Sequence, residues 1–373
     1  MMLLNNTKRL DYIDWAKAIA IILIVLGNFM PDGSWPRALF YSFHVPIFGI
    51  IGGILFAAPK SWRELGKKSI NIATRLLVPY VIFFAVCCSF YFMPEESMPS
   101  LVAGSATTDF GELLKYFVFY EGKTVWNVTL SFMPCYIVIS LVFLLFAKLT
   151  KGRRDAAFAL ASALFLALII MEKKEFTIDI GEVKNVFGMK NYFLMLGFYA
   201  IGYALRPMLD ICQNAFLSPK KNPFIISSIC AFCMLTLICI RFQAVEITEK
   251  RPAGYTAASM YSGVYNGMAQ FIAFALLLSV TLIIALMILP KCRPINLISR
   301  SSLFIMFAHV FVFFDKTFTS LFPYEVLWEV DMKIAYRDAA SVMVILLIVL
   351  AIFDAIQKKF PKTRYIFTSI GIK

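Results

Sequence analysis

The chain has 373 residues, of which 60% are hydrophobic and 16% are charged, and its formal net charge is +13. Soluble domains carry about 25% charged residues, so this composition excludes an ordinary soluble globular fold. The basic residues stand in short connectors between long apolar runs and form no continuous stripe, which argues against a nucleic-acid-binding protein. The positive-inside bias of a multi-pass membrane protein accounts for the net charge instead.

Apolar segments, each close to the ~20 residues that cross a bilayer, follow one another along the chain. They lie at residues 12–30, 37–57, 70–93, 127–147, 155–172, 190–207, 223–242, 265–289, 299–322 and 336–356. We therefore predict an all-α, polytopic helical bundle of about ten transmembrane helices. The bundle forms a single integral-membrane domain over residues 1–373, with short tails at 1–11 and 357–373.

Basic residues gather in alternate connectors. Lys60 and Arg63 follow the second segment, and Lys148 and Arg153 follow the fourth, whereas the connectors between them are acidic or mixed. Because cytoplasmic loops carry the excess of Lys and Arg, we expect both termini to be cytoplasmic. The sequence thus predicts a multi-pass protein of the cytoplasmic (inner) membrane of a bacterium.

The first apolar segment carries polar residues toward both of its ends. Asp14 and Lys17 lie near the inner end, and Gly27 and Asn28 lie near the outer end. Lys17 and Asn28 are eleven residues apart, so a helix places them only about 20° apart around its axis and ~16 Å apart along it. This arrangement suits a protein whose two substrates arrive from opposite sides. Alternatively, Lys17 extends to the interface beside Asp14.

The chain has two histidines, and both lie in apolar segments. His44 is expected near the outer end of the second segment, across a short turn from Asn28, where an imidazole can take a proton from a hydroxyl group. The alternative for His44 is an interfacial histidine satisfied by backbone or water. His309 lies well inside the ninth segment and needs a polar partner. It either orients a substrate or another residue, or makes a structural hydrogen bond between helices.

Arg75 opens the third segment on the predicted cytoplasmic side. Its planar guanidinium group is well suited to binding phosphate. The alternative is an ordinary positive-inside anchor, which is the role of most arginines at such positions.

Four pieces of sequence stand in a characteristic order: Asp14-x-x-Lys17 followed by Gly27, Phe43-His44-x-Pro46-x-Phe48, Arg75-Leu-Leu-x-Pro79, and a late segment that ends at His309. Together they resemble the acyltransferase-3 family of integral-membrane O-acyltransferases, in particular its fucose 4-O-acetylase-like branch. The resemblance implies transfer of an acetyl or other short acyl group from cytoplasmic acyl-CoA to a hydroxyl of a surface glycan or its lipid-linked precursor. It implies polysaccharide biosynthesis, with acyl-CoA as co-substrate and with neither a bound cofactor nor a metal.

The resemblance also assigns roles to individual residues. Lys17 and Arg75 fall at positions tied to the acyl donor, and we assign supporting roles to Asp14 and His309. Asn28 stands where the family usually has a catalytic histidine. An amide takes up no proton at physiological pH, so His44 becomes the candidate base and Asn28 a hydrogen-bond donor to an oxyanion. The alternative is a catalytically impaired relative that binds or transports a glycan or lipid.

Overall fold

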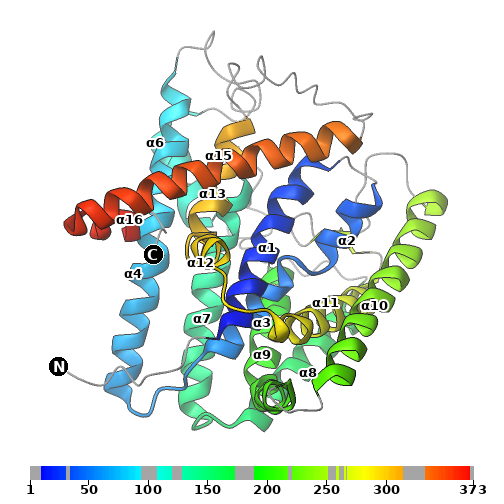
Figure 1. Ribbon diagram of the computed structural model, residues 1–373. Coiled ribbons are helices and arrows are strands. Elements are labelled where there is room, and N and C mark those ends of the chain that lie inside the picture. Colours follow the sequence, from blue (N-terminus) through cyan, green and yellow to red (C-terminus); the bar gives the residue numbers. More distant parts are fainter. Residues whose placement is uncertain are drawn as a thin grey trace.

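The computed structural model describes residues 10–30, 34–93, 107–119, 128–172, 189–216, 221–250, 258–259, 264–265, 267–313 and 332–369. These residues form a bundle of helices (Figure 1), which confirms the predicted all-α polytopic fold. The α-helices are α1 (Asp11–Phe29), α2 (Trp35–Phe43), α3 (Pro46–Leu55), α4 (Trp62–Ser89), α6 (Phe110–Phe119), α7 (Phe132–Leu149), α8 (Arg154–Ile170), α9 (Met189–Phe216), α10 (Lys221–Lys250), α11 (Met268–Ala285), α12 (Arg293–Arg300), α13 (Ser302–Phe313), α15 (Met332–Lys359) and α16 (Arg364–Ser369). Two-residue strands, β1 (Ala258–Ser259) and β2 (Val264–Tyr265), pair antiparallel.

Within the described residues, each predicted apolar segment overlaps a helix or two consecutive helices, and residues 314–322 of the ninth segment lie outside the described residues. Within the described residues, 7 helical segments are long and apolar enough to cross a membrane, and the bent pair α12–α13 raises the number to 8. The two other predicted segments are shorter: α8 has 17 residues, and the apolar part of α10 is Ile226–Cys239. The protein is therefore a multi-pass membrane protein whose spans differ in length.

Two of the predicted spans are broken helices. The second begins at Trp35 and divides at His44 into α2 and α3, so His44 lies in the middle of the span and not near its end. A residue before proline usually avoids helical geometry, yet Val45, which precedes Pro46, has φ −84° and ψ −49°, which is helical. Pro46 starts α3, where its missing N–H breaks no helical hydrogen bond. The ninth span bends by 73° between α12 and α13.

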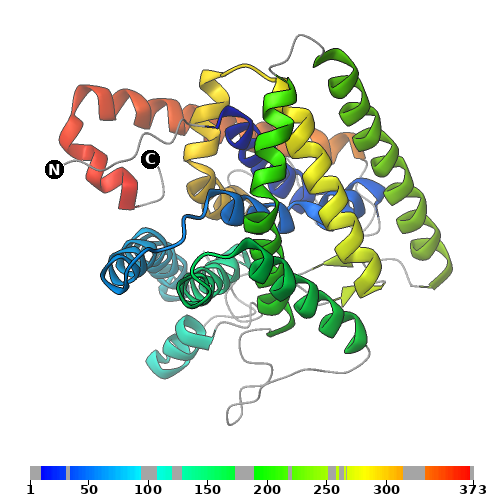
Figure 2. The same cartoon turned by 90° about the horizontal axis from the view of Figure 1, so that it is seen from below.

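Helix α1 stands at the centre of the fold. It packs against α2, α3, α11, α12, α13 and α15, and it is enclosed by other helices in both ribbon views (Figure 1 and Figure 2). One face of α1, with Ala16 and Ala20, belongs to a core that also includes residues of α3, α8, α9 and α11. The opposite face, with Ile21 and Val25, belongs to a second core with residues of α4, α13 and α15. Polar residues of α1 therefore lie between two apolar layers.

Glycines allow α3 and α9 to pack with their backbones in contact. A Cβ added at Gly53 would lie 1.9 Å from the carbonyl oxygen of Tyr199, and one added at Gly202 would lie 2.1 Å from that of Ile50. Real Cβ atoms do not approach this closely, so these positions accept only glycine. The G-x-x-x-G spacing of Gly49 and Gly53 thus serves helix packing, as such spacings commonly do.

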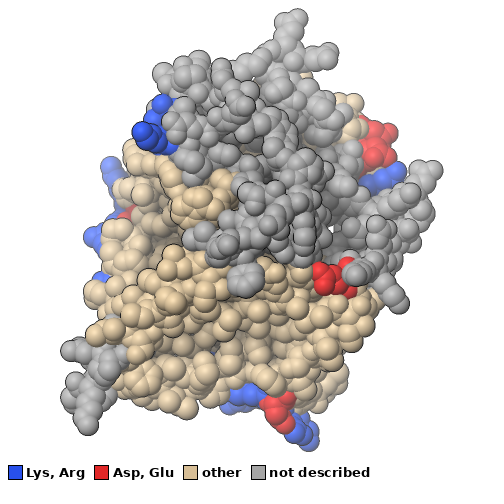
Figure 3. Space-filling model, turned by 90° about the vertical axis from the view of Figure 1, so that its right-hand side faces the viewer, with Lys and Arg blue, Asp and Glu red and all other residues tan. Residues whose placement is uncertain are grey.

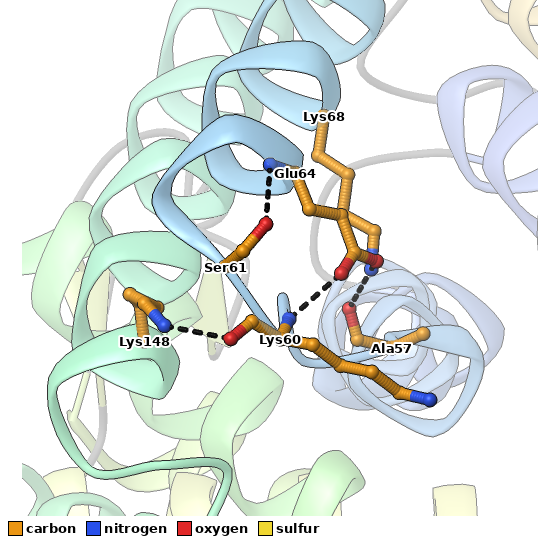
Figure 4. Close-up of polar contacts among 6 residues, drawn as sticks. All are labelled: Ala57, Lys60, Ser61, Glu64, Lys68 and Lys148. Carbon is orange, nitrogen blue, oxygen red and sulfur yellow. Dashed lines mark hydrogen bonds and ion pairs between the residues drawn. The ribbon is translucent and has the colours of Figure 1, made fainter.

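The basic connectors after the second and fourth segments are joined by polar contacts at one end of the bundle (Figure 4). Ser61 caps α4 by accepting a hydrogen bond from the Glu64 backbone N–H at 3.1 Å, while the Glu64 carboxylate accepts one from the Lys60 N–H at 2.8 Å. The arrangement is similar to a capping box, except that the Glu64 carboxylate accepts from the residue before the N-cap, Lys60, and not from Ser61 itself. Lys148, in the last turn of α7, donates to the Lys60 carbonyl at 2.9 Å. These two connectors therefore lie together.

Large apolar side chains cover the outside of the bundle. Ile170 is 72% exposed, Ile211 69% and Leu237 61%. The face drawn in Figure 3 has a broad area without charged side chains, above Lys, Arg, Asp and Glu residues at its lower edge. An apolar surface of this extent is unfavourable in water and is matched by lipid. The membrane side on which the termini lie stays a prediction.

Candidate functional site

The candidate site is centred on Asn28 in the last turn of α1. Helix α2 folds back across the end of α1, so the ring of Tyr41 lies directly against Gly27. A Cβ added at Gly27 would lie 2.9 Å from Cε2 of Tyr41. The absence of a side chain at Gly27 therefore lets the Tyr41 ring reach the position at which it contacts Asn28.

Asn28 links two other helices through hydrogen bonds. The Tyr41 hydroxyl of α2 donates to Oδ1 of Asn28 at 2.8 Å. Nδ2 of Asn28 lies 2.7 Å from Nε2 of His309 on α13, and Nδ1 of His309 lies 2.9 Å from the Ile305 carbonyl oxygen. A carbonyl only accepts, so Nδ1 of the neutral imidazole carries the proton and Nε2 accepts from the Asn28 amide. The result is a directional chain from Tyr41 through Asn28 and His309 to the Ile305 carbonyl.

His44 ends α2 and is buried beside this chain. Its Nδ1–H donates to the carbonyl of Phe40, one turn earlier, so Nε2 carries the lone pair of the neutral ring. Within the described residues, Nε2 of His44 has no hydrogen-bond partner. The His44 and Tyr41 rings meet edge to face, with centroids 4.7 Å apart. Tyr41 thus contacts both Asn28 and His44.

Two residues of this group, Tyr41 and Arg37, are missed by sequence reasoning. Arg37 lies over the Tyr41 ring, with Cζ 5.1 Å from its centroid, and donates to the Met30 carbonyl at 2.9 Å. Arg37 is a charged residue within an apolar span, which is the signal that points to it in the sequence. Tyr41 has no such signal, because its contact with Asn28 depends on how α2 packs against the end of α1.

The inner part of α1 carries a second polar contact. Asp14 is 8% exposed, and its Oδ1 accepts a hydrogen bond from the Ser299 hydroxyl of α12 at 2.7 Å. Lys17 lies one turn further along α1 and is half-buried. Both Lys17 and Asn28 belong to one uninterrupted helix, so the distance of ~16 Å between their levels along the axis follows from its rise.

Arg75 lies apart from these residues. Its side chain is exposed on α4 and makes no hydrogen bond or ion pair within the described residues. The next residue, Leu76, packs against the core shared with α1 and α13. The structure therefore brings together Asn28, His44 and His309 through Tyr41 and leaves Arg75 outside this group.

The site offers hydrogen-bonding groups and one open imidazole nitrogen. Asn28 Nδ2 has two N–H bonds, and His309 accepts only one of them. In the described part of the chain, no group of three or more His, Cys, Asp and Glu side chains is placed to hold a metal ion. The groups of the site are able to accept a proton, at the His44 imidazole, and to donate a hydrogen bond, from the Asn28 amide.

Comparison with known proteins identifies the family. No curated protein and no solved structure matches the chain. The narrower resemblance to fucose 4-O-acetylases therefore stays a prediction. A family model described as an acyltransferase domain matches residues 10–369, a range that includes every helix described above. The chain therefore belongs to the acyltransferase-3 family of integral-membrane acyltransferases.

Proposed function

We propose that the protein transfers an acetyl or other short acyl group from cytoplasmic acyl-CoA to a hydroxyl of a surface glycan or its lipid-linked precursor. The observation that carries the proposal is the buried His44 imidazole, whose Nε2 is open beside the Tyr41–Asn28–His309 chain. A neutral imidazole with Nδ1–H held by an acceptor and Nε2 open has the form of a general base.

In the proposed reaction, the acceptor hydroxyl gives its proton to Nε2 of His44 while its oxygen attacks the thioester carbonyl carbon. The carbonyl oxygen becomes an oxyanion, which the second N–H of Asn28 stabilises by donating a hydrogen bond. The carbon–sulfur bond then breaks, the ester forms, and the coenzyme A thiolate takes the proton back from His44. All atoms and protons are accounted for without a further reactant.

The acyl donor is proposed to lie along the inner half of α1. Lys17 supplies a cation there, and the basic connectors that contain Lys60 and Lys148 supply others at one end of the bundle. Cations of this kind suit the phosphates of coenzyme A. Arg75 is proposed to contribute from the exposed side of α4, and it makes no direct contact with Asn28, His44 or His309.

The experiment is a transfer assay with purified protein, radiolabelled acetyl-CoA and candidate glycan acceptors. His44→Ala is expected to reduce transfer by about 10²- to 10⁴-fold, the usual effect of losing a general base. His44→Gln is the matched variant, because it keeps a polar side chain of similar size and lacks the base. Both variants are checked for folding by their unfolding temperature. Full activity in folded His44→Ala would remove His44 from the mechanism.

A second candidate function follows from the hydrogen bonds of Asn28. Both ends of its amide are already engaged by Tyr41 and His309, as in a purely structural link. In a relative that binds a glycan or lipid without transferring an acyl group, Asn28 would only join the helices in this way. In the same assay, acyl-CoA binding without release of labelled product would support that function and contradict the enzyme.

A further inference from the structure

One buried carboxylate takes no part in the site described above. Asp338, near the start of α15, is 4% exposed, and its Oδ1 accepts from Arg337 Nε at 2.9 Å. Its second oxygen, Oδ2, is buried and has no hydrogen-bond partner within the described structure. A buried carboxylate oxygen without a partner is costly, and ionisable residues inside membrane spans usually mark functional positions.

Asp338 lies on the buried face of α15, which packs against the rest of the bundle. It begins the buried stripe of α15, which continues through Ala339, Val342 and Leu346. Helix α15 packs against α1 and α13, the helices that carry Asn28 and His309. In Figure 1 the start of α15 lies beside the end of α1. Asp338 therefore belongs to the same end of the bundle as Asn28.

A second buried polar atom at this end has no partner. The Oγ of Ser34, at the start of α2, is buried and makes no hydrogen bond within the described structure. Ser34 precedes α2 without capping it, although serine at this position usually does so. Two helices that begin near the end of α1 thus each leave one polar atom unsatisfied.

The chemistry of Asp338 and Arg337 selects the kind of ligand. Oδ2 can only accept a hydrogen bond, so its partner must be a donor. Arg337 already balances the charge of the carboxylate, with Nη2 2.9 Å from Oδ1, so a cationic ligand gains little. The Ser34 hydroxyl can both donate and accept. A neutral polyhydroxylated molecule satisfies these groups better than an amine or an anion does.

We propose that Asp338 and Ser34 form part of the acceptor-binding site and hold a neutral sugar through its hydroxyl groups. This inference rests on the proposed function, because it supplies the recognition that transfer to a glycan requires. Hydroxyl groups that do not react are bound at Asp338 Oδ2 and Ser34 Oγ, and a neighbouring hydroxyl is directed to His44. Neither residue takes part in the bond-making step.

The experiment compares two variants in equilibrium binding of radiolabelled methyl glycosides of neutral hexoses and deoxyhexoses. Asp338→Asn keeps an oxygen for Arg337 and places an NH₂ donor at the position of Oδ2. Ser34→Ala removes an unsatisfied hydroxyl, so the unfolding temperature is expected to stay the same or to rise. Asp354→Asn is the matched control, since Asp354 lies on the same helix and pairs with Lys358 at the far end.

The expected result is a loss of glycoside affinity of about tenfold or more in Asp338→Asn, as for a lost hydrogen bond to a charged group. Ser34→Ala is expected to weaken affinity without loss of stability, and Asp354→Asn to leave it unchanged. Unchanged affinity in both folded test variants, or no glycoside binding by the wild type, would overturn the inference. Transfer is measured separately, so wild-type binding without transfer would contradict only the proposed enzyme.

If Asp338→Asn does not fold, the inference is tested on the wild-type protein by chemical modification. An apolar carbodiimide modifies buried carboxyl groups, and the modified peptide is quantified by mass spectrometry. Bound glycoside is expected to protect Asp338 from modification and to leave Asp354 unprotected. Equal modification of Asp338 with and without bound glycoside would overturn the inference.

Discussion

Tyr41→Phe tests whether the hydrogen-bonded chain orients Asn28 for the reaction. The substitution removes only the hydroxyl that donates to Asn28 Oδ1 at 2.8 Å, and it retains the ring that contacts His44 and Arg37. An acceptor left unsatisfied in a buried site costs about 1–3 kcal/mol. If this hydrogen bond holds the amide in the orientation that the transition state needs, its loss raises the activation free energy by the same amount. The kcat then falls by about five- to 150-fold. The KM for acyl-CoA stays unchanged, because Tyr41 lies at the other end of α1 from Lys17.

Tyr80→Phe is the matched control for this measurement. Tyr80 is also buried, and its hydroxyl donates to the Phe117 carbonyl at 3.0 Å, away from Asn28. The Tyr80→Phe variant is expected to lose a similar free energy of unfolding to Tyr41→Phe and to keep the kcat of the wild type. Asn28→Ala combined with Tyr41→Phe should be no slower than Asn28→Ala alone, because Tyr41 acts through Asn28. Equal kcat values for Tyr41→Phe and wild type, or additive losses in the double variant, would refute the reasoning.

Two further substitutions test the packing and the inner contact. Gly27→Ala places a Cβ 2.9 Å from Tyr41 Cε2. It is expected to lower the free energy of unfolding by about 1–3 kcal/mol and to reduce transfer activity. The control is Gly66→Ala, whose Cβ meets nothing within 4 Å and should stabilise α4 by up to about 1 kcal/mol. Equal unfolding temperatures for the two variants would contradict this difference. Ser299→Ala removes the donor to the buried carboxylate of Asp14 and is expected to lower the free energy of unfolding by about 1.5–3 kcal/mol. A denaturation midpoint equal to that of the wild type would show that Asp14 does not depend on this bond.

The helices could be predicted from the sequence because membrane spans leave a strong signal. A segment that crosses the lipid needs about 20 mostly apolar residues, and charged residues are left to the connectors. Its backbone polar groups must bond to one another inside the lipid, so such a segment forms a helix. The breaks inside two of these stretches could not be predicted in the same way. Pro46 indicates that a helix begins close to His44, but the way in which α2 folds back across α1 is set by tertiary contacts. The bend between α12 and α13, which both pack against α1, has the same origin.

The members of the candidate site could be predicted only in part. Asn28, His44 and His309 stand out as polar residues in apolar segments, and the structure places all three near Tyr41 or bonded to one another. Tyr41 is one of many aromatic residues, so composition gives no reason to choose it. Its position follows from the close approach of α2 to Gly27, which is a tertiary contact between two helices.

The hydrogen-bonding capacity of an amide explains how Asn28 can serve a site without a histidine at its position. Asn28 accepts from Tyr41 and donates to His309, and its second N–H makes no hydrogen bond to the described part of the chain. A neutral imidazole has one donor and one acceptor, so the same two partners would use its whole capacity. In the proposed reaction, Asn28 therefore joins the helices and also donates to the substrate oxygen, and the proton acceptor is a different residue. His44 has the open nitrogen that this division requires.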